Sequence, residues 1–162
     1  MLEIKKTEIN NLDDVLKIYE HAREEMRKNG NPHQWKNSHP LTQDIIFDIN
    51  HGNSYIIYDE NGIYGVFSLF LEPDETYGYI EGSWLNDEEY ATIHKIASNN
   101  LKKGILEIAV NFALSKKSNV RIDTHEDNKI MHYLLKKLGF QKRGIIYLKN
   151  GESRIAYQKV KI

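Results

Sequence analysis

The stretch IHKIASNNLKKGILEIAVNFA, residues 93–113, contains a strand pattern, a polar loop and a helix pattern in direct succession. The part up to Ser98 is typical of a β-strand, and from Gly104 onward apolar residues recur at helical spacing. A loop that opens a helix presents unpaired backbone N–H groups at the positive end of the helix dipole, which suits a phosphate. The loop matches neither GxGxxG nor a P-loop, however, and a plain connection with solvated lysines explains the same residues. Its role therefore depends on the segments around it.

An antiparallel meander is predicted before this unit. The runs Ser54–Tyr58 and Ile63–Leu71 are rich in β-branched and aromatic residues and are joined by a turn that ends in Asn-Gly, which indicates a hairpin. Thr76–Gly82 and Tyr90–Ala97 predict two further strands.

Two helices are expected nearer the N-terminus. Apolar residues recur every three or four positions between a cap at Asn11 and a stop at Gly30, which indicates an amphipathic helix. A second, shorter helix is expected to begin at the cap Thr42 and to end at Gly52.

The chain alternates strand and helix after residue 104. Val120–Asp123 is typical of a short buried strand, and Asp127 or Asn128 is expected to cap the helix that follows. This alternation implies a right-handed crossover with at least one parallel strand pair. Gly144–Leu148 and Arg154–Val160 predict the two last strands, on either side of an Asn-Gly turn.

These elements predict one domain over residues 1–162, of the α/β (α+β) class. We expect a mixed, mostly antiparallel sheet of about six or seven strands with about four helices. No internal repeat or linker divides the chain.

The composition excludes several kinds of site. Cysteine is absent, so the chain has no disulfide, thiolate metal site or cysteine nucleophile. The seven histidines include no pair at the i, i+4 spacing of a zinc motif, so no metal is expected. The formal net charge of −1 demands neither a nucleic-acid nor a membrane partner, and no apolar run approaches the ~20 residues of a membrane span. We expect a cytoplasmic protein.

Two motifs carry a resemblance to a known family. The pattern Q/R-x-x-G-x-G/A falls on residues 101–106 and matches at Gly104. The pattern N-x-x-A-x-x-L-Y-x-K-x-G-F falls on residues 128–140 and matches at Asn128, Leu134, Lys137, Gly139 and Phe140. Together with the order of elements, these motifs make the chain resemble the GNAT superfamily of acetyl-coenzyme A-dependent N-acetyltransferases, and within it one bacterial branch. The chain departs from the motifs at Leu101, Leu106, Met131 and Leu135.

The resemblance implies a cleft for acetyl-coenzyme A (acetyl-CoA). Two neighbouring strands of this family splay apart, here residues 90–98 and 120–124, and the pantetheine arm lies in the gap like an added strand. The pyrophosphate would meet the N–H groups of the loop quoted first. The residues implied to contact the cofactor are Ile96, Ala97, Ser98, Leu101, Lys102, Lys103, Gly104, Ile105, Asn128 and Met131.

The resemblance also implies direct attack of an amine on the thioester in a ternary complex, with a backbone N–H near Ile96 stabilising the oxyanion. A base must remove a proton from the ammonium group, and Glu81 and His94 are the candidate catalytic residues. Glu81 would share one strand face with Tyr77 and Tyr79. The alternatives are a solvent-facing carboxylate for Glu81 and a hydrogen-bonded structural role for His94.

The family's usual general acid is a tyrosine where this chain has Leu135. Leucine donates no proton, and Tyr133 lies roughly 200° round the helix and should face elsewhere. Either another group protonates coenzyme A, or the thiolate leaves and is protonated by water, or catalysis is reduced or absent.

Tyr79, on the strand face of Glu81, and the loop residues Trp35 and Trp84 are expected to line the acceptor pocket, since loops on a rigid scaffold often carry binding residues. The alternative for the two tryptophans is that they cover the edge of the core. The leading hypothesis is an N-acetyltransferase that acts on a primary amine of a small molecule, or of a peptide. The rival is a non-catalytic coenzyme A-binding or sensory module. The oligomeric state stays open, with a homodimer as a candidate.

Overall fold

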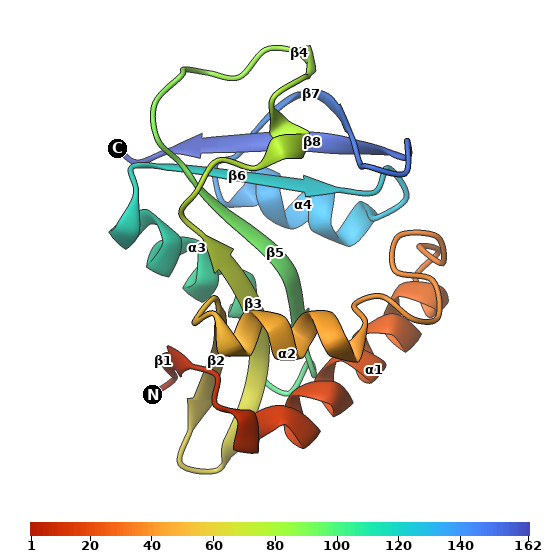
Figure 1. The fold of residues 1–162 in the computed structure, drawn as a ribbon, viewed down its shortest axis with the longest axis vertical. Coiled ribbons are helices and arrows are strands. Elements are labelled where there is room, and N and C mark those ends of the chain that lie inside the picture. Colours follow the sequence, from red (N-terminus) through yellow and green to blue (C-terminus); the bar gives the residue numbers. More distant parts are fainter.

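The structure, a computed structural model, describes residues 1–162 and places eight strands in one sheet, in the order β1-β2-β3-β5-β6-β8-β7-β4 (Figure 1). The strands are β1 Glu3–Lys6, β2 Ser54–Asp59, β3 Gly62–Phe70, β4 Glu81–Gly82, β5 Ala91–Ser98, β6 Asn119–Thr124, β7 Gln141–Tyr147 and β8 Ser153–Val160. The helices are η1 Ile9–Asn11, α1 Leu12–Lys28, α2 Thr42–Asn50, η2 Glu75–Tyr77, α3 Ile105–Lys116 and α4 Lys129–Lys137, of which η1 and η2 are short 3-10 helices.

The predicted α/β (α+β) class is confirmed. Four α-helices accompany the sheet, and β5 and β6 form its one parallel pair. Strand β1, which pairs with β2 at the sheet edge, was not predicted, and it brings the number of strands to eight. None of the helices combines the length and the hydropathy that a membrane-spanning helix needs.

The predicted strand Thr76–Gly82 is largely wrong. Residues 75–77 form η2 instead, because the Asp74 side chain caps this turn: its Oδ1 accepts hydrogen bonds from the amide of Thr76 at 2.8 Å and from the Thr76 hydroxyl at 2.6 Å. Only Glu81–Gly82 pairs in the sheet, with β7.

Two boundaries also differ from the prediction, and the structure decides between the two predicted caps of α4. Leu41 is the N-cap of α2, so Thr42 is its first helical residue and not its cap. Asn128, rather than Asp127, caps α4, and its Oδ1 accepts from the Met131 amide at 3.1 Å. Strand β7 begins three residues earlier than expected, at Gln141.

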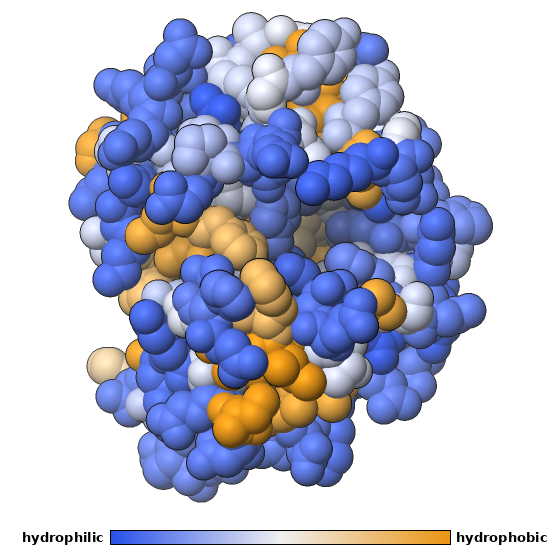
Figure 2. All heavy atoms as spheres, viewed as in Figure 1, coloured by the Kyte–Doolittle hydropathy of each residue, from blue (hydrophilic) through white to orange (hydrophobic).

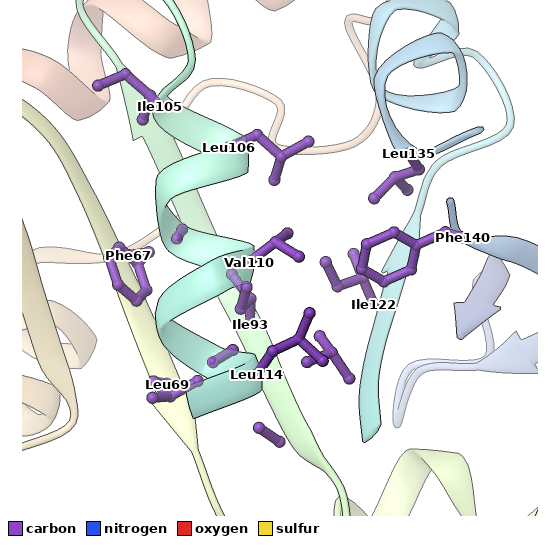
Figure 3. Packing of buried hydrophobic residues seen from close by; sticks show 14 of the residues in the cluster. Phe67, Leu69, Ile93, Ile105, Leu106, Val110, Leu114, Ile122, Leu135 and Phe140 are labelled. Carbon is purple, nitrogen blue, oxygen red and sulfur yellow. The ribbon is translucent and has the colours of Figure 1, made fainter. Parts of the chain in front are cut away.

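The helices cover both faces of the sheet. Alternate residues of β2 and β3 point to opposite faces: Ile56 and Val66 belong to the apolar cluster with α1 and α2, whereas Ile57 and Phe67 belong to the cluster with α3. Figure 3 shows α3 between the side chains of β3 and those of β6 and the α4 region. Leu135 of α4 lies fully buried in this second cluster.

Strands β5 and β6 separate soon after they meet. They pair only through Ala91 with Val120 and Thr92 with Arg121, and β5 then diverges from β6 (Figure 1). The register of β3 against β5 also shifts between Val66 and Ser68. Together the separation and the bulge leave part of the β5 backbone unpaired at the centre of the sheet.

Lys95 lies at this bulge with a φ of 53°, a conformation that non-glycine residues rarely adopt. Its carbonyl accepts a hydrogen bond from the Tyr19 hydroxyl at 2.8 Å. Its Nζ donates to Oδ2 of the buried Asp48 at 2.8 Å, and the same oxygen accepts from the Ser68 hydroxyl. These contacts from α1, α2 and β3 hold the bulge in place.

Candidate active site

A cavity of about 500 Å³ lies between the C-terminal end of β5, the loop before α3, and α4. Eight of the ten residues predicted to bind the cofactor line it, namely Ile96, Ala97, Ser98, Lys102, Lys103, Gly104, Ile105 and Met131. Leu101 is 72% exposed and lies outside it. Residues not predicted also line it, and they include a third lysine, Lys137.

The loop before α3 offers a row of free hydrogen-bond donors to this cavity. The backbone N–H groups of residues 102–107 make no hydrogen bond within the protein. The loop itself is held by side chains: the Asn100 amide donates to the Ser98 hydroxyl at 3.0 Å, and the Leu101 amide donates to Asn99 Oδ1 at 3.1 Å. Gly104 has a φ of 80° and is the N-cap of α3. Free donors at a helix N-terminus, with lysines beside them, fit the diphosphate of coenzyme A.

A second cavity, of about 360 Å³, lies on the other side of the opening between β5 and β6. Figure 2 shows the surface hollowed near the centre of this view. Its walls come from the loop after α1, from residues 93–96 of β5, from the end of β6 and from the β7–β8 turn. Ile96 and Met131 line both cavities, so the two cavities meet at these side chains.

His94 lies in the wall of the second cavity and is held by a carboxylate. Its Nε2 is 2.7 Å from Oδ2 of Asp74. Burial raises the pKa of Asp74, but the hydrogen bonds from His94 and Thr76 and the charge of His94 outweigh this effect and hold that pKa at about 2. Asp74 is therefore ionised at neutral pH. It binds Nε2 of the imidazole, so Nδ1 is the ring nitrogen that has no carboxylate partner.

Asp123, at the end of β6, is a carboxylate in the wall of the same cavity. Its Oδ2 accepts a hydrogen bond from the Tyr77 hydroxyl at 2.6 Å, and the Tyr77 ring centroid lies 6.1 Å from that of His94. Burial, followed by the charge of Asp123, raises the pKa of Tyr77 well above its usual value, so Tyr77 stays neutral. Tyr77 thus donates to Asp123 and packs beside the ring of His94.

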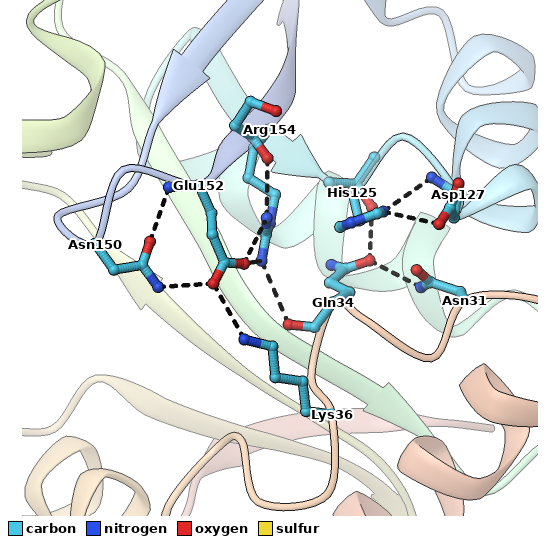
Figure 4. A network of polar contacts seen from close by, with 10 residues as sticks. Asn31, Gln34, Lys36, His125, Asp127, Asn150, Glu152 and Arg154 are labelled. Carbon is cyan, nitrogen blue, oxygen red and sulfur yellow. Dashed lines mark hydrogen bonds and ion pairs between the residues drawn. The ribbon is translucent and has the colours of Figure 1, made fainter.

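Gln34 joins the loop after α1 to the end of β6 and to α4 (Figure 4). Its Oε1 accepts from Asn31 Nδ2 at 2.9 Å, from the Thr124 hydroxyl at 3.2 Å and from Asn128 Nδ2 at 3.0 Å. The structure thus places Asn128, predicted to contact the cofactor, in the wall of the second cavity, with its amide bonded to Gln34. Trp35, predicted to bind the acceptor, lies in the same wall and is 6% exposed.

Solved structures with the same fold place the chain among known proteins. An acetyltransferase of the GNAT family from Streptococcus agalactiae is 31% identical, with a TM-score of 0.88, and the alignment covers 99% of this chain and 96% of that one. The chain belongs to the GNAT family. A GNAT-family acetyltransferase from Listeria monocytogenes shares the fold at 19% identity and a TM-score of 0.72, over 98% of this chain and 94% of that one. Scans of protein-family models and of curated proteins give no match.

Besides Leu101, three residues predicted for the GNAT site lie outside both cavities. Glu81 is exposed on the edge strand β4, where it accepts a hydrogen bond from the Tyr147 hydroxyl at 2.7 Å. Tyr79 is 65% exposed and stacks on Tyr147. Trp84 packs against Tyr77 and donates to its carbonyl at 3.0 Å. The premise of one shared strand face fails because Tyr77 lies in η2 and is buried.

Leu135, at the position where the GNAT family usually has its tyrosine acid, is part of the hydrophobic core in this chain. Leu135 is fully buried against α3, and Tyr133 is 66% exposed and lines neither cavity. Sequence reasoning missed Asp74, Asp123 and Gln34, because each acts through a partner that is distant along the chain. No side-chain group of three or more His, Asp or Glu could hold a metal ion.

Proposed function

We propose that this GNAT protein transfers an acetyl group from acetyl-CoA to the primary amine of a small molecule, in a ternary complex. The observation that carries the proposal is the meeting of the two cavities at Ile96 and Met131, in the opening between β5 and β6. A donor in one cavity and an acceptor in the other would bring their reacting atoms together there. Proximity of this kind supplies much of the rate of a two-substrate reaction.

The chain's own groups suit the donor. On the side toward β6, the backbone of Ile96 to Ser98 has no strand partner and would pair with the pantetheine amides, in the manner of an added strand. The free N–H groups of residues 102–107 would bind the diphosphate, with Lys102, Lys103 and Lys137 adding positive charge. Acetyl-CoA, when bound, supplies the thioester that the amine attacks.

His94 is the candidate general base. With Nε2 donating to Asp74, Nδ1 is available to take a proton from the acceptor's ammonium group, directly or through a water molecule, which frees the amine lone pair for attack. A backbone N–H at the β5 bulge would stabilise the charge that develops on the carbonyl oxygen. Since Leu135 is buried, we propose that the C–S bond breaks without a tyrosine acid and that the thiolate takes its proton from solvent.

Two measurements test the proposal. Calorimetric titration with acetyl-CoA should show binding, and acetyl-pantetheine, which lacks the diphosphate, should bind much more weakly. Release of free thiol is then followed with a panel of amines. Binding without thiol release for any amine would favour a non-catalytic coenzyme A-binding module. Absence of binding at millimolar acetyl-CoA would exclude both functions.

A further inference from the structure

The charged side chains of the second cavity fall into two groups. Five ionisable side chains other than histidine line it: Lys36, Lys95, Asp123, Glu152 and Arg154. Lys95 is neutralised by Asp48, which lies 2.8 Å away. The remaining groups form an acidic wall at Asp123 and a basic cluster of Lys36, Glu152 and Arg154.

The basic cluster has more positive than negative charge. Lys36 Nζ lies 3.1 Å from Glu152 Oε2, and Arg154 Nη2 lies 3.5 Å from Glu152 Oε1. One carboxylate thus serves two cations. Figure 4 shows how these three side chains bring together the loop after α1 and the β7–β8 turn.

Arg154 keeps unused capacity to bind an anion. Its side chain is only 6% exposed, yet both of its contacts with Glu152 are 3.5 Å long. Its other hydrogen bonds go to main-chain oxygens, that of Ser153 at 2.9 Å and that of Gln34 at 3.3 Å. A buried guanidinium normally binds a carboxylate through two short parallel bonds of about 2.7–2.9 Å. The contacts of Arg154 with Glu152 are longer than this, so the guanidinium can still bind another carboxylate.

Asp123 is the opposite case. Its only hydrogen-bonding side-chain partner is the neutral Tyr77 hydroxyl, and no cation pairs with it. It lies in the same wall as His94, the candidate base. An ammonium group of the acceptor would therefore be attracted to the side of the cavity where the proposed reaction occurs.

We infer that the acceptor is a small amine that also carries a carboxylate, as a free amino acid does. Its ammonium group binds between Asp123 and His94, and its carboxylate binds Arg154 and Lys36. This inference rests on the proposed function and specifies its acceptor. A cavity of about 360 Å³ suits a small molecule better than a folded protein segment. The planar fork of Arg154 matches a carboxylate in geometry as well as charge.

The test uses pairs of acceptors that differ only in the carboxylate, such as lysine and cadaverine, or alanine and ethylamine. Dissociation constants are measured by calorimetry on coenzyme A-saturated protein, a readout that needs no turnover, and kcat/KM is measured by thiol release. We expect at least one acid to bind ten times more tightly than its amine partner or more. Equal affinities within every pair, or no binding by any acid, would overturn the inference.

Variants locate the effect. R154Q and K36M should each bring the ratio of affinities within a pair toward one, and Lys36 is exposed enough that its replacement spares the fold. K149M is the matched control, because Lys149 is exposed and lines neither of the two cavities, and its ratio should stay as in the wild type. Ratios that are unchanged in both test variants would remove the basic cluster from the acceptor site. Turnover with plain amines alone would refute this inference while leaving acetyl transfer intact.

Discussion

The imidazole of His94 and the carboxylate of Asp74 form a contact of 2.7 Å that joins β5 to the segment before η2. The contact is reinforced from the side of Asp74, whose amide donates to the Tyr90 hydroxyl and whose Oδ1 accepts from Thr76. The pair therefore has the two features of a general base, an orienting carboxylate and a position in a cavity wall.

Loss of either member should affect turnover more than cofactor affinity. We expect H94Q to lower kcat about 100-fold, the lower range of general-base effects, with the dissociation constant for acetyl-CoA unchanged. D74N should lower kcat less, because the imidazole is still present but is no longer oriented by a carboxylate. The control variant is H125Q, because His125 lies outside both cavities and its replacement should leave kcat unchanged. Full activity in H94Q would exclude His94 as the base.

The low pKa of Asp74 predicts a loss of stability in acid. A carboxyl group with a folded pKa of about 2 and an unfolded value of 3.8 binds fewer protons when folded. Its contribution, about 2 kcal/mol, is therefore present above pH 3.8 and is lost as the pH falls toward 2. Between pH 5 and pH 2 the free energy of unfolding of the wild type should fall by about that much more than that of D74N, as measured by denaturant titration. Parallel pH dependences would contradict this.

Lys102 and Lys103 are expected to strengthen binding of the coenzyme A phosphates. The double variant K102A/K103A should weaken acetyl-CoA binding about tenfold at low salt and reduce the dependence of affinity on ionic strength, because charge interactions of exposed groups are screened. The double variant K17A/K142A removes two exposed lysines outside the cavities and should leave affinity unchanged. If the two double variants bind acetyl-CoA with the same affinity, Lys102 and Lys103 do not contribute to phosphate binding.

Gly104 should matter for both stability and cofactor binding. Its φ of 80° costs an alanine about 1 kcal/mol, although an added Cβ would meet no atom within 4 Å. Gly30 has a φ of 79° and equally open surroundings, so G30A is a matched control for stability. Both variants should lose about 1 kcal/mol of unfolding free energy, but only G104A should weaken acetyl-CoA binding. A normal affinity in G104A would show that the loop does not bind the phosphates through its backbone.

Leu135 cannot be turned into a general acid by a single exchange. Because the side chain is fully buried, L135Y should overpack the core and lower the unfolding free energy by about 1–3 kcal/mol, with no gain in kcat. Y133F should leave kcat unchanged, since Tyr133 faces solvent. A faster L135Y would mean that an acid at this position can reach the leaving thiolate.

Local patterns sufficed where a short segment forms an element by itself. The Asn-Gly turn and its flanking apolar runs predicted the hairpin β2–β3, and helical spacing after Gly104 predicted α3. Sequence reasoning failed for residues 75–77, where the alternation of Tyr77, Tyr79 and Glu81 resembles a strand. The Asp74 side chain captures this turn, and burial of Tyr77 against its neighbours outweighs strand propensity.

The sequence by itself determined most of the order of the elements and the side of the site proposed to bind the cofactor, since residues 96–105 are contiguous and a helix N-terminus needs few particular side chains to bind a phosphate. Tertiary structure alone decided the acceptor side. His94 and Asp74 lie 20 residues apart, Tyr77 and Asp123 lie 46 apart, and Gln34 and Asn128 lie 94 apart. Such pairs leave no local pattern, because they form only when the separation of β5 from β6 brings four distant segments around one cavity.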